Sequence, residues 1–193
     1  MGRLRTGVAA LAILLAALSG CGKTGTNSSN NPAAPPPSVW PLPEDPRAAA
    51  QKAGLSMLDR EMFAVHYHAH LDVVVRGVRV TVPAGMGIDT RRSLISPLHT
   101  HDAAGIVHIE SAEDIPFTLG QFFTEWGQPL STTRVGPVTV VEGEQLRVYR
   151  NGDRVSGDPA KVRFTEHAEI VVWVGPAGAQ PKVPTSYDFP PDL

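Results

Sequence analysis

The stretch at residues 66–82, HYHAHLDVVVRGVRVTV, decides the fold predicted for this chain. Its first part, to residue 75, carries a run of β-branched side chains, and residues 78–82 alternate apolar with polar ones, as half-buried strands do. The pair Arg76-Gly77 between the two parts suits a tight turn. The stretch therefore predicts a β-hairpin.

The rest of the chain repeats the strand pattern. Further strands are predicted at 106–110, 138–141, 145–149 and 169–174, with a second hairpin turn at Asn151-Gly152. A helix is predicted at 118–126 from a Thr118–Gln121 capping box and an apolar stripe at helical spacing, and a short one at 47–53. We therefore expect a mainly β, small α+β fold: a single β-rich domain of hairpins, sandwich or barrel-like, with one packed amphipathic helix.

The N-terminus predicts an exported lipoprotein. Arg3 and Arg5 precede an apolar run at 7–18 that is too short to span a bilayer, and residues 1–20 read as a signal peptide. The end of this run, LSGC, resembles the lipobox of bacterial lipoproteins, so Cys21 is the expected lipidation site. The lipid would attach the protein to the extracytoplasmic face of the cell membrane. A plain secretory peptide and an uncleaved anchor are the alternatives.

Composition divides the remaining chain. Residues 21–43 form a Pro/Ser/Asn-rich segment that is predicted to be a disordered tether, 44–177 the folded domain and 178–193 an irregular tail. The formal net charge is −2, without a basic patch, which argues against a nucleic-acid partner. Cys21 is the only cysteine, so lipidation would leave the domain without a thiolate ligand.

Histidines are the residues most indicative of function. Seven occur, and six lie within one stretch of the chain: His66, His68, His70, His99, His101 and His108. In a strand, alternate side chains share a face, so each His-x-His pair places two imidazoles roughly 6.6 Å apart on one side. Such pairs predict a metal site, whereas the isolated His167 is interpreted as an ordinary hydrogen-bonded residue.

Strand geometry limits how many of these histidines one ion can use. His66 and His70 would lie roughly 13 Å apart, so we expect one site centred on four residues, with His66 and His108 as additional or alternative ligands. The central four are His68, His70, His99 and His101. Asp102 and Glu110 are expected to accept the free imidazole N–H groups. All-imidazole ligation suits copper or zinc.

The blocks HYHAHLDVVV, SPLHTHDAAGIVHIES and FTLGQFFTEWG resemble a family of uncharacterised, chiefly actinobacterial exported proteins and lipoproteins that share these blocks in this order. The resemblance covers about residues 55–177. It implies that the six histidines are a recurring feature, and it brings no activity with it.

Three functions remain open from the sequence. A metal-binding protein is favoured, because no paired carboxylates or obvious general base adjoin the His-x-His pairs. The alternative is a small metal-dependent enzyme, hydrolytic or redox, with an open coordination position and Glu110 as its base. A structural protein whose histidines only form hydrogen bonds is the third. The fragment HAHLD resembles the metal motif of metallo-β-lactamase-like hydrolases but has Val73 where that motif requires histidine.

Overall fold

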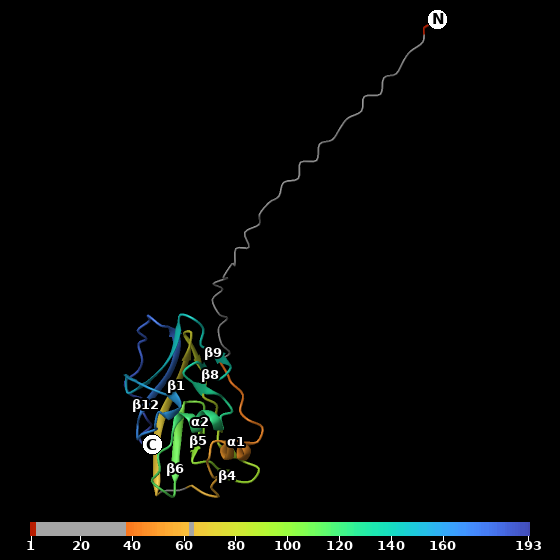
Figure 1. The fold of residues 1–193 in the computed structure, drawn as a ribbon. Coiled ribbons are helices and arrows are strands. Elements are labelled where there is room, and N and C mark those ends of the chain that lie inside the picture. The colour runs from red at the N-terminus through yellow and green to blue at the C-terminus, as the bar shows by residue number, and fades with distance from the viewer. Residues whose placement is uncertain (3–37, 62–63) are drawn as a thin grey trace. The chain divides into compact units, whose positions relative to one another are not determined.

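The structure is a computed structural model that describes residues 1–2, 38–61 and 64–193, and the elements described below belong to the compact unit that ends at Leu193 (Figure 1). Most of the predicted signal peptide, the lipidation site Cys21 and the tether up to residue 37 lie outside the described residues. Among the residues that are described, no helix is both long and apolar enough to cross a membrane.

The fold is mainly β, as predicted, and the described part of the chain has two α-helices and three sheets. The helices are α1 (Pro46–Lys52), α2 (Leu119–Glu125) and a 3-10 turn, η1 (Pro159–Lys161). The strands are β1 (Val65–Val75), β2 (Val78–Val80), β3 (Ile88–Asp89), β4 (Leu94–Ile95), β5 (Leu98–His99), β6 (Ile106–Ser111), β7 (Leu130–Ser131), β8 (Arg134–Val135), β9 (Val138–Thr139), β10 (Glu144–Arg150), β11 (Asp153–Val155) and β12 (Glu169–Pro176).

The main sheet has the strand order β11-β10-β12-β1-β6-β5, with β2 also paired to β1. Both predicted hairpins are present, because Arg76-Gly77 and Asn151-Gly152 all adopt the positive φ that a two-residue primed turn requires. β1 pairs antiparallel with β6 along one half and parallel with β12 along the other. This parallel contact joins segments almost 100 residues apart.

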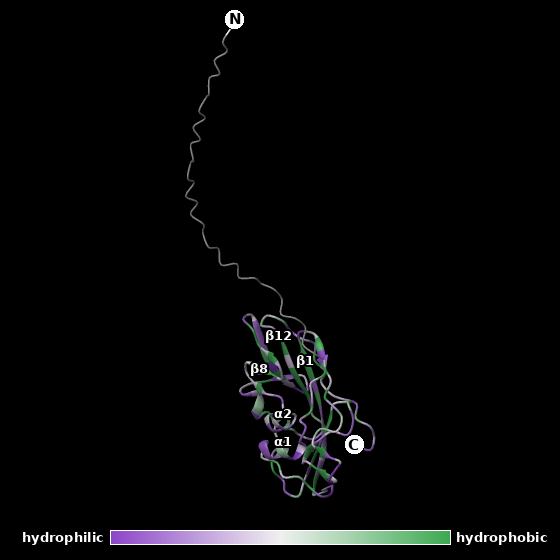
Figure 2. Ribbon diagram, turned by 90° about the vertical axis from the view of Figure 1, so that its right-hand side faces the viewer, coloured by the Kyte–Doolittle hydropathy of each residue, from purple (hydrophilic) through white to green (hydrophobic). Residues whose placement is uncertain are grey.

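One face of the sheet forms the hydrophobic core. The odd-numbered residues of β1, such as Ala69, Leu71 and Val73, are fully buried there. They lie in one hydrophobic core with Phe122 of α2 and with Trp126, the C-cap residue of that helix. Figure 2 shows β1 and β12 as largely hydrophobic strands. The capping box predicted for α2 is present, and its aromatic stripe faces this core.

The opposite face carries the even-numbered residues of β1 and is partly covered by the C-terminal segment. Residues 177–193 contain no helix or strand but run back along the sheet (Figure 1). Ala179 and Val183 pack on Val171 and Trp173 of β12, and Arg147 donates to the carbonyl oxygen of Ala179 at 2.6 Å. The irregular tail is therefore part of the folded unit.

The folded unit also begins before residue 44, where the domain was predicted to start. Trp40 is only 1% exposed and stacks at a tilt on Trp126, with 5.4 Å between ring centroids. A side chain at position 136 would come within 2.6 Å of the Trp40 ring, which explains Gly136. Any truncation of the domain should therefore keep Trp40.

Candidate metal centre

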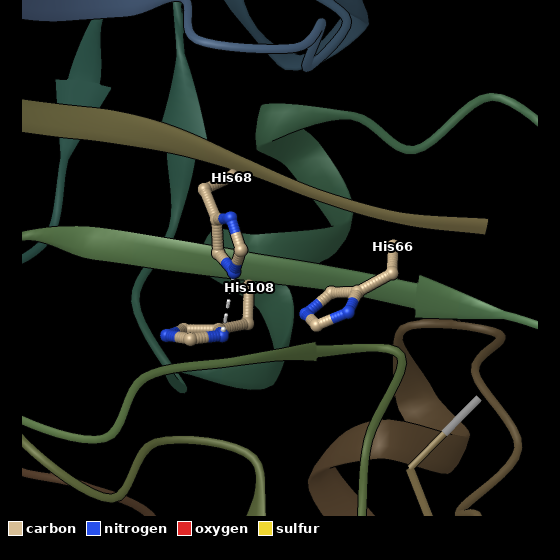
Figure 3. Close-up of side chains that lie close together, drawn as sticks. All are labelled: His66, His68 and His108. Carbon is tan, nitrogen blue, oxygen red and sulfur yellow. Dashed lines mark hydrogen bonds between the residues drawn. The ribbon is translucent and has the colours of Figure 1, made fainter. Parts of the chain in front are cut away.

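Three histidines form a row across three adjacent strands. His108 of β6 lies opposite His68 of β1 on one side and opposite His99 of β5 on the other. Directly paired residues of neighbouring strands project to the same face, so the three rings share one side of the sheet. Figure 3 shows His68 and His108 converging there, with His66 farther along β1. β-sheet register alone therefore builds the middle of the site.

Two groups of three imidazoles meet at His108. His66, His68 and His108 place one nitrogen each within 4.8 Å of one another, and His99, His101 and His108 do the same. The closest nitrogens are His68 Nε2 and His108 Nδ1 at 3.1 Å, and the two Nε2 atoms of His99 and His101 at 3.2 Å. We call these five residues the histidine cluster.

Glu110 adds a carboxylate to the histidine cluster. It pairs with His66 across β1 and β6, and its side chain is 1% exposed. The same atom, Oε1, lies 3.5 Å from His66 Nε2 and 3.7 Å from His99 Nε2, so it faces both groups of imidazoles. Glu110 therefore lies where the sequence predicted a partner for the histidines, and it can also serve as an oxygen ligand.

Backbone contacts fix the orientation of His99. Its Nδ1 donates to the carbonyl oxygen of Ser96 at 2.9 Å, so the lone pair of the neutral ring is on Nε2, which faces His101. Metal-binding histidines are commonly held by such a bond from the second nitrogen. A Cβ on Gly87 would come within 2.4 Å of the Leu98 carbonyl oxygen and 3.0 Å of the His99 Cβ. The glycine therefore lets its loop pack directly against β5.

Burial favours the neutral form of three rings of the cluster, His68, His99 and His108. Desolvation, followed by the neighbouring imidazoles, lowers the pKa of His99 to about 4 and that of His108 to about 3. Burial also lowers the pKa of His68. Metal ions bind the deprotonated ring, so these three ligands are ready for binding at neutral pH. His66 and His101 are exposed and form the solvent side of the cluster.

His70 lies apart from the other histidines, although the sequence placed it at the centre of the site. Its Nδ1 is 2.7 Å from Glu169 Oε2 and its Nε2 is 2.9 Å from the carbonyl oxygen of Ala104. It belongs to a different group with Asp72 and Glu169. The reason is its position in β1: His70 is paired with Glu169 of β12 on one side and with the apolar Ile106 of β6 on the other, so no histidine lies opposite it.

The predicted role of Asp102 is not what the structure shows. Its Oδ1 accepts a hydrogen bond from the Ala104 backbone N–H and thus closes the turn after His101. His167 belongs to neither group of imidazoles and stacks on Phe189. The sequence analysis missed Glu169, whose only signal was a carboxylate at the start of an apolar strand, and Tyr187, which lies in the tail.

The spacing of the nitrogens in the cluster suits a metal ion. Four ligands about 2.0–2.1 Å from a tetrahedral ion lie about 3.3 Å from one another, close to the two short distances in the cluster. Imidazole nitrogens with one adjacent carboxylate form a donor set for zinc or copper. Comparison with known protein families, curated proteins and solved structures finds no significant match to this chain.

Proposed function

We propose that this chain is a membrane-anchored, extracytoplasmic lipoprotein that binds copper or zinc through the histidine cluster. The observation that carries the proposal is the convergence of five imidazoles and the Glu110 carboxylate on one face of the sheet. If these closely spaced rings took up protons, their positive charges would repel one another. A bound metal ion is instead coordinated by the lone pairs of the neutral rings.

Copper and zinc suit the cluster for the same reason. Both accept imidazole nitrogen, and copper(II) binds most tightly among the divalent first-row ions. Copper(I) also accepts a thioether ligand, and Met57 and Met62 are the methionines that shortly precede β1. Met57 packs against the hydrophobic core, and Met62 lies outside the described residues. The cluster itself is therefore the site proposed for either metal.

The test is the metal content of the full-length protein, carrying a histidine-free affinity tag and dialysed after loading with zinc or copper(II). At least one ion per chain should remain bound at neutral pH. The same preparation with His68, His99 and His108 all changed to Ala should have lost the ions of the cluster. Equal metal content in the two proteins would refute the proposal.

A metal-dependent enzyme is the second candidate, favoured by the exposure of His66 and His101. Small molecules could reach an ion bound beside these rings from the solvent. Azide added to the copper(II)-loaded protein distinguishes the two functions. A shift of the copper absorption band indicates an open coordination position and favours an enzyme, whereas an unchanged band indicates a closed, binding-only site.

Membrane attachment rests on the sequence alone, namely the charged n-region, the apolar run and the cysteine at position 21. A diacylated cysteine supplies the two lipid chains that stable anchoring requires. Cys21→Ala should therefore release the protein from membranes or leave it unprocessed. Mass spectrometry of the mature N-terminus decides the matter: an unmodified cysteine, or cleavage elsewhere, contradicts the anchor.

A further inference from the structure

A second group of metal-ligating side chains lies on the same face of the sheet, outside the histidine cluster. His70 pairs with Glu169 across the parallel strands β1 and β12, and Asp72 follows on the same face. One ligand atom of each residue lies within 4.8 Å of the other two. The exposed fractions are 5% for His70, 5% for Asp72 and 1% for Glu169, so the group is buried.

The hydrogen bonds of His70 show where a cation is needed. Its Nε2 faces the Ala104 carbonyl oxygen, which only accepts, so Nε2 carries a proton. In the neutral ring the Nδ1 lone pair then points at Glu169 Oε2, 2.7 Å away. A lone pair and a carboxylate oxygen at this distance require a positive charge between them. Either a proton or a metal ion can supply it.

One of the two carboxylates of this group, Glu169, is incompletely compensated. Glu169 Oε1 is fully buried and makes no hydrogen bond among the residues that the structure describes. Arg79 pairs with Asp72, but its side chain is 65% exposed and reaches the carboxylate from the solvent side. Buried carboxylate oxygens normally have partners. The unpartnered oxygen of Glu169 is thus a second, independent observation that favours a cation at this group.

The surroundings hold His70 rigidly in this orientation. Tyr187 of the C-terminal segment stacks on the imidazole, with 3.8 Å between ring centroids and 8° between the planes. A Cβ on Gly105 would come within 2.9 Å of His70 Nε2, so only glycine allows the loop to approach this closely. Metal-ligating histidines are typically fixed in this way, with the second nitrogen bonded to a carbonyl or carboxylate.

We infer that His70, Asp72 and Glu169 form a second metal site, separate from the histidine cluster, which takes a divalent first-row cation. One imidazole nitrogen with two carboxylates is a mixed donor set that zinc and manganese accept, and its oxygens make it relatively better for manganese than the cluster. The tail residue Tyr187 covers this site. The inference does not depend on the metal of the cluster, because no ligand is shared.

Manganese(II) titration followed by electron paramagnetic resonance tests the inference, because the signal of the free ion reports how much is bound. The full-length protein with a histidine-free tag is compared with Glu169→Gln and Asp72→Asn. Glu144→Gln is the matched control, since Glu144 pairs with Arg76 elsewhere in the sheet. Each protein is also measured with His68, His99 and His108 replaced by Ala, which removes the three buried rings of the cluster.

We expect one manganese ion per chain that persists without the cluster, and at least a tenfold weaker Kd in Glu169→Gln and Asp72→Asn but not in Glu144→Gln. Circular dichroism checks that each variant is folded, and Asp72→Asn decides the question if Glu169→Gln is not. Unchanged manganese binding in a folded variant would show that only a proton lies between His70 and Glu169, which overturns the inference.

Discussion

The two faces of β1 are opposites in chemistry although their residues alternate along one strand. Ala69, Leu71 and Val73 lie in the hydrophobic core with α2, whereas His68, His70 and Asp72 lie on the other face and are almost as deeply buried. Burial of polar groups weakens a fold unless they have partners. The apolar face therefore accounts for stability, and the metal sites that we propose would explain the polar face.

The largest effect on stability should come from the apolar face. Phe122 of α2 is fully buried, and Phe122→Ala should lower the free energy of unfolding by about 3–5 kcal/mol through lost burial and a cavity. Urea unfolding of the metal-free protein measures this. His108→Ala should cost clearly less in the same assay. Equal losses of unfolding free energy in the two variants would contradict the idea that stability comes mainly from the apolar face.

His108→Ala should instead produce the largest loss of metal binding, because His108 belongs to both groups of imidazoles. The loss of affinity should exceed the roughly 10- to 100-fold that removal of an outer partner causes. Competition with a chromophoric chelator gives the affinity.

The matched control is His167→Asn, since residue 167 has a φ of 53°, which asparagine tolerates better than alanine. It should change the affinity less than twofold, a margin well inside the effects of outer partners. A loss as large as that of His108→Ala would place His167 within the site.

Glu110→Gln should have an intermediate effect. It keeps the shape of the side chain but removes the charge that faces His66 and His99, and should weaken zinc binding by about 10- to 100-fold. Isothermal titration measures the change, with Glu144→Gln as control. An unchanged affinity would mean that the carboxylate has no part in the centre.

Per pH unit, the smallest expected effect on stability is the pH dependence of the metal-free protein. Burial holds the pKa of His99 at about 4 and of His108 at about 3, so between those values and about 6.5 the unfolded chain binds more protons than the folded one. The contribution of these two histidines to stability is thus complete above pH about 6.5 and is lost as the pH drops. Each histidine contributes a slope of at most about 1.4 kcal/mol per pH unit.

Urea unfolding at several pH values measures this slope. Glu125 acts in the opposite direction, since burial raises its pKa to about 8, so it reduces stability as the pH rises toward that value. The difference between the wild type and His108→Ala isolates the histidine contribution. The variant should show a shallower loss below pH about 6.5. Parallel curves for the two proteins would contradict the assignment of a buried, neutral His108.

Local patterns explain why much of the fold could be predicted. The turns at Arg76-Gly77 and Asn151-Gly152 and the capping box at Thr118 depend on neighbouring residues, and all three are present. The alternation of side chains along a strand also predicts that His66 and His68 project from the same face of the sheet. These features need no knowledge of distant segments.

The site was predicted less completely because its details depend on long-range register. The two-residue pairing of β5 with β6 places His99 beside His108, which makes His108 central and not an additional ligand. The parallel pairing of β1 with β12 places His70 beside Glu169, which is 99 residues away in the sequence. Neither pairing has a local signal in the sequence.

X-ray absorption spectroscopy of the zinc-loaded, full-length protein tests the central claim most directly, because it reports the atoms bound to the ion. At one zinc ion per chain, we predict a first shell dominated by nitrogen at about 2.0–2.1 Å, with the outer-shell scattering of several imidazole rings, and fewer such rings around the ion in His108→Ala. A first shell of oxygen alone, without imidazole scattering, would show that the histidine cluster is not a metal centre.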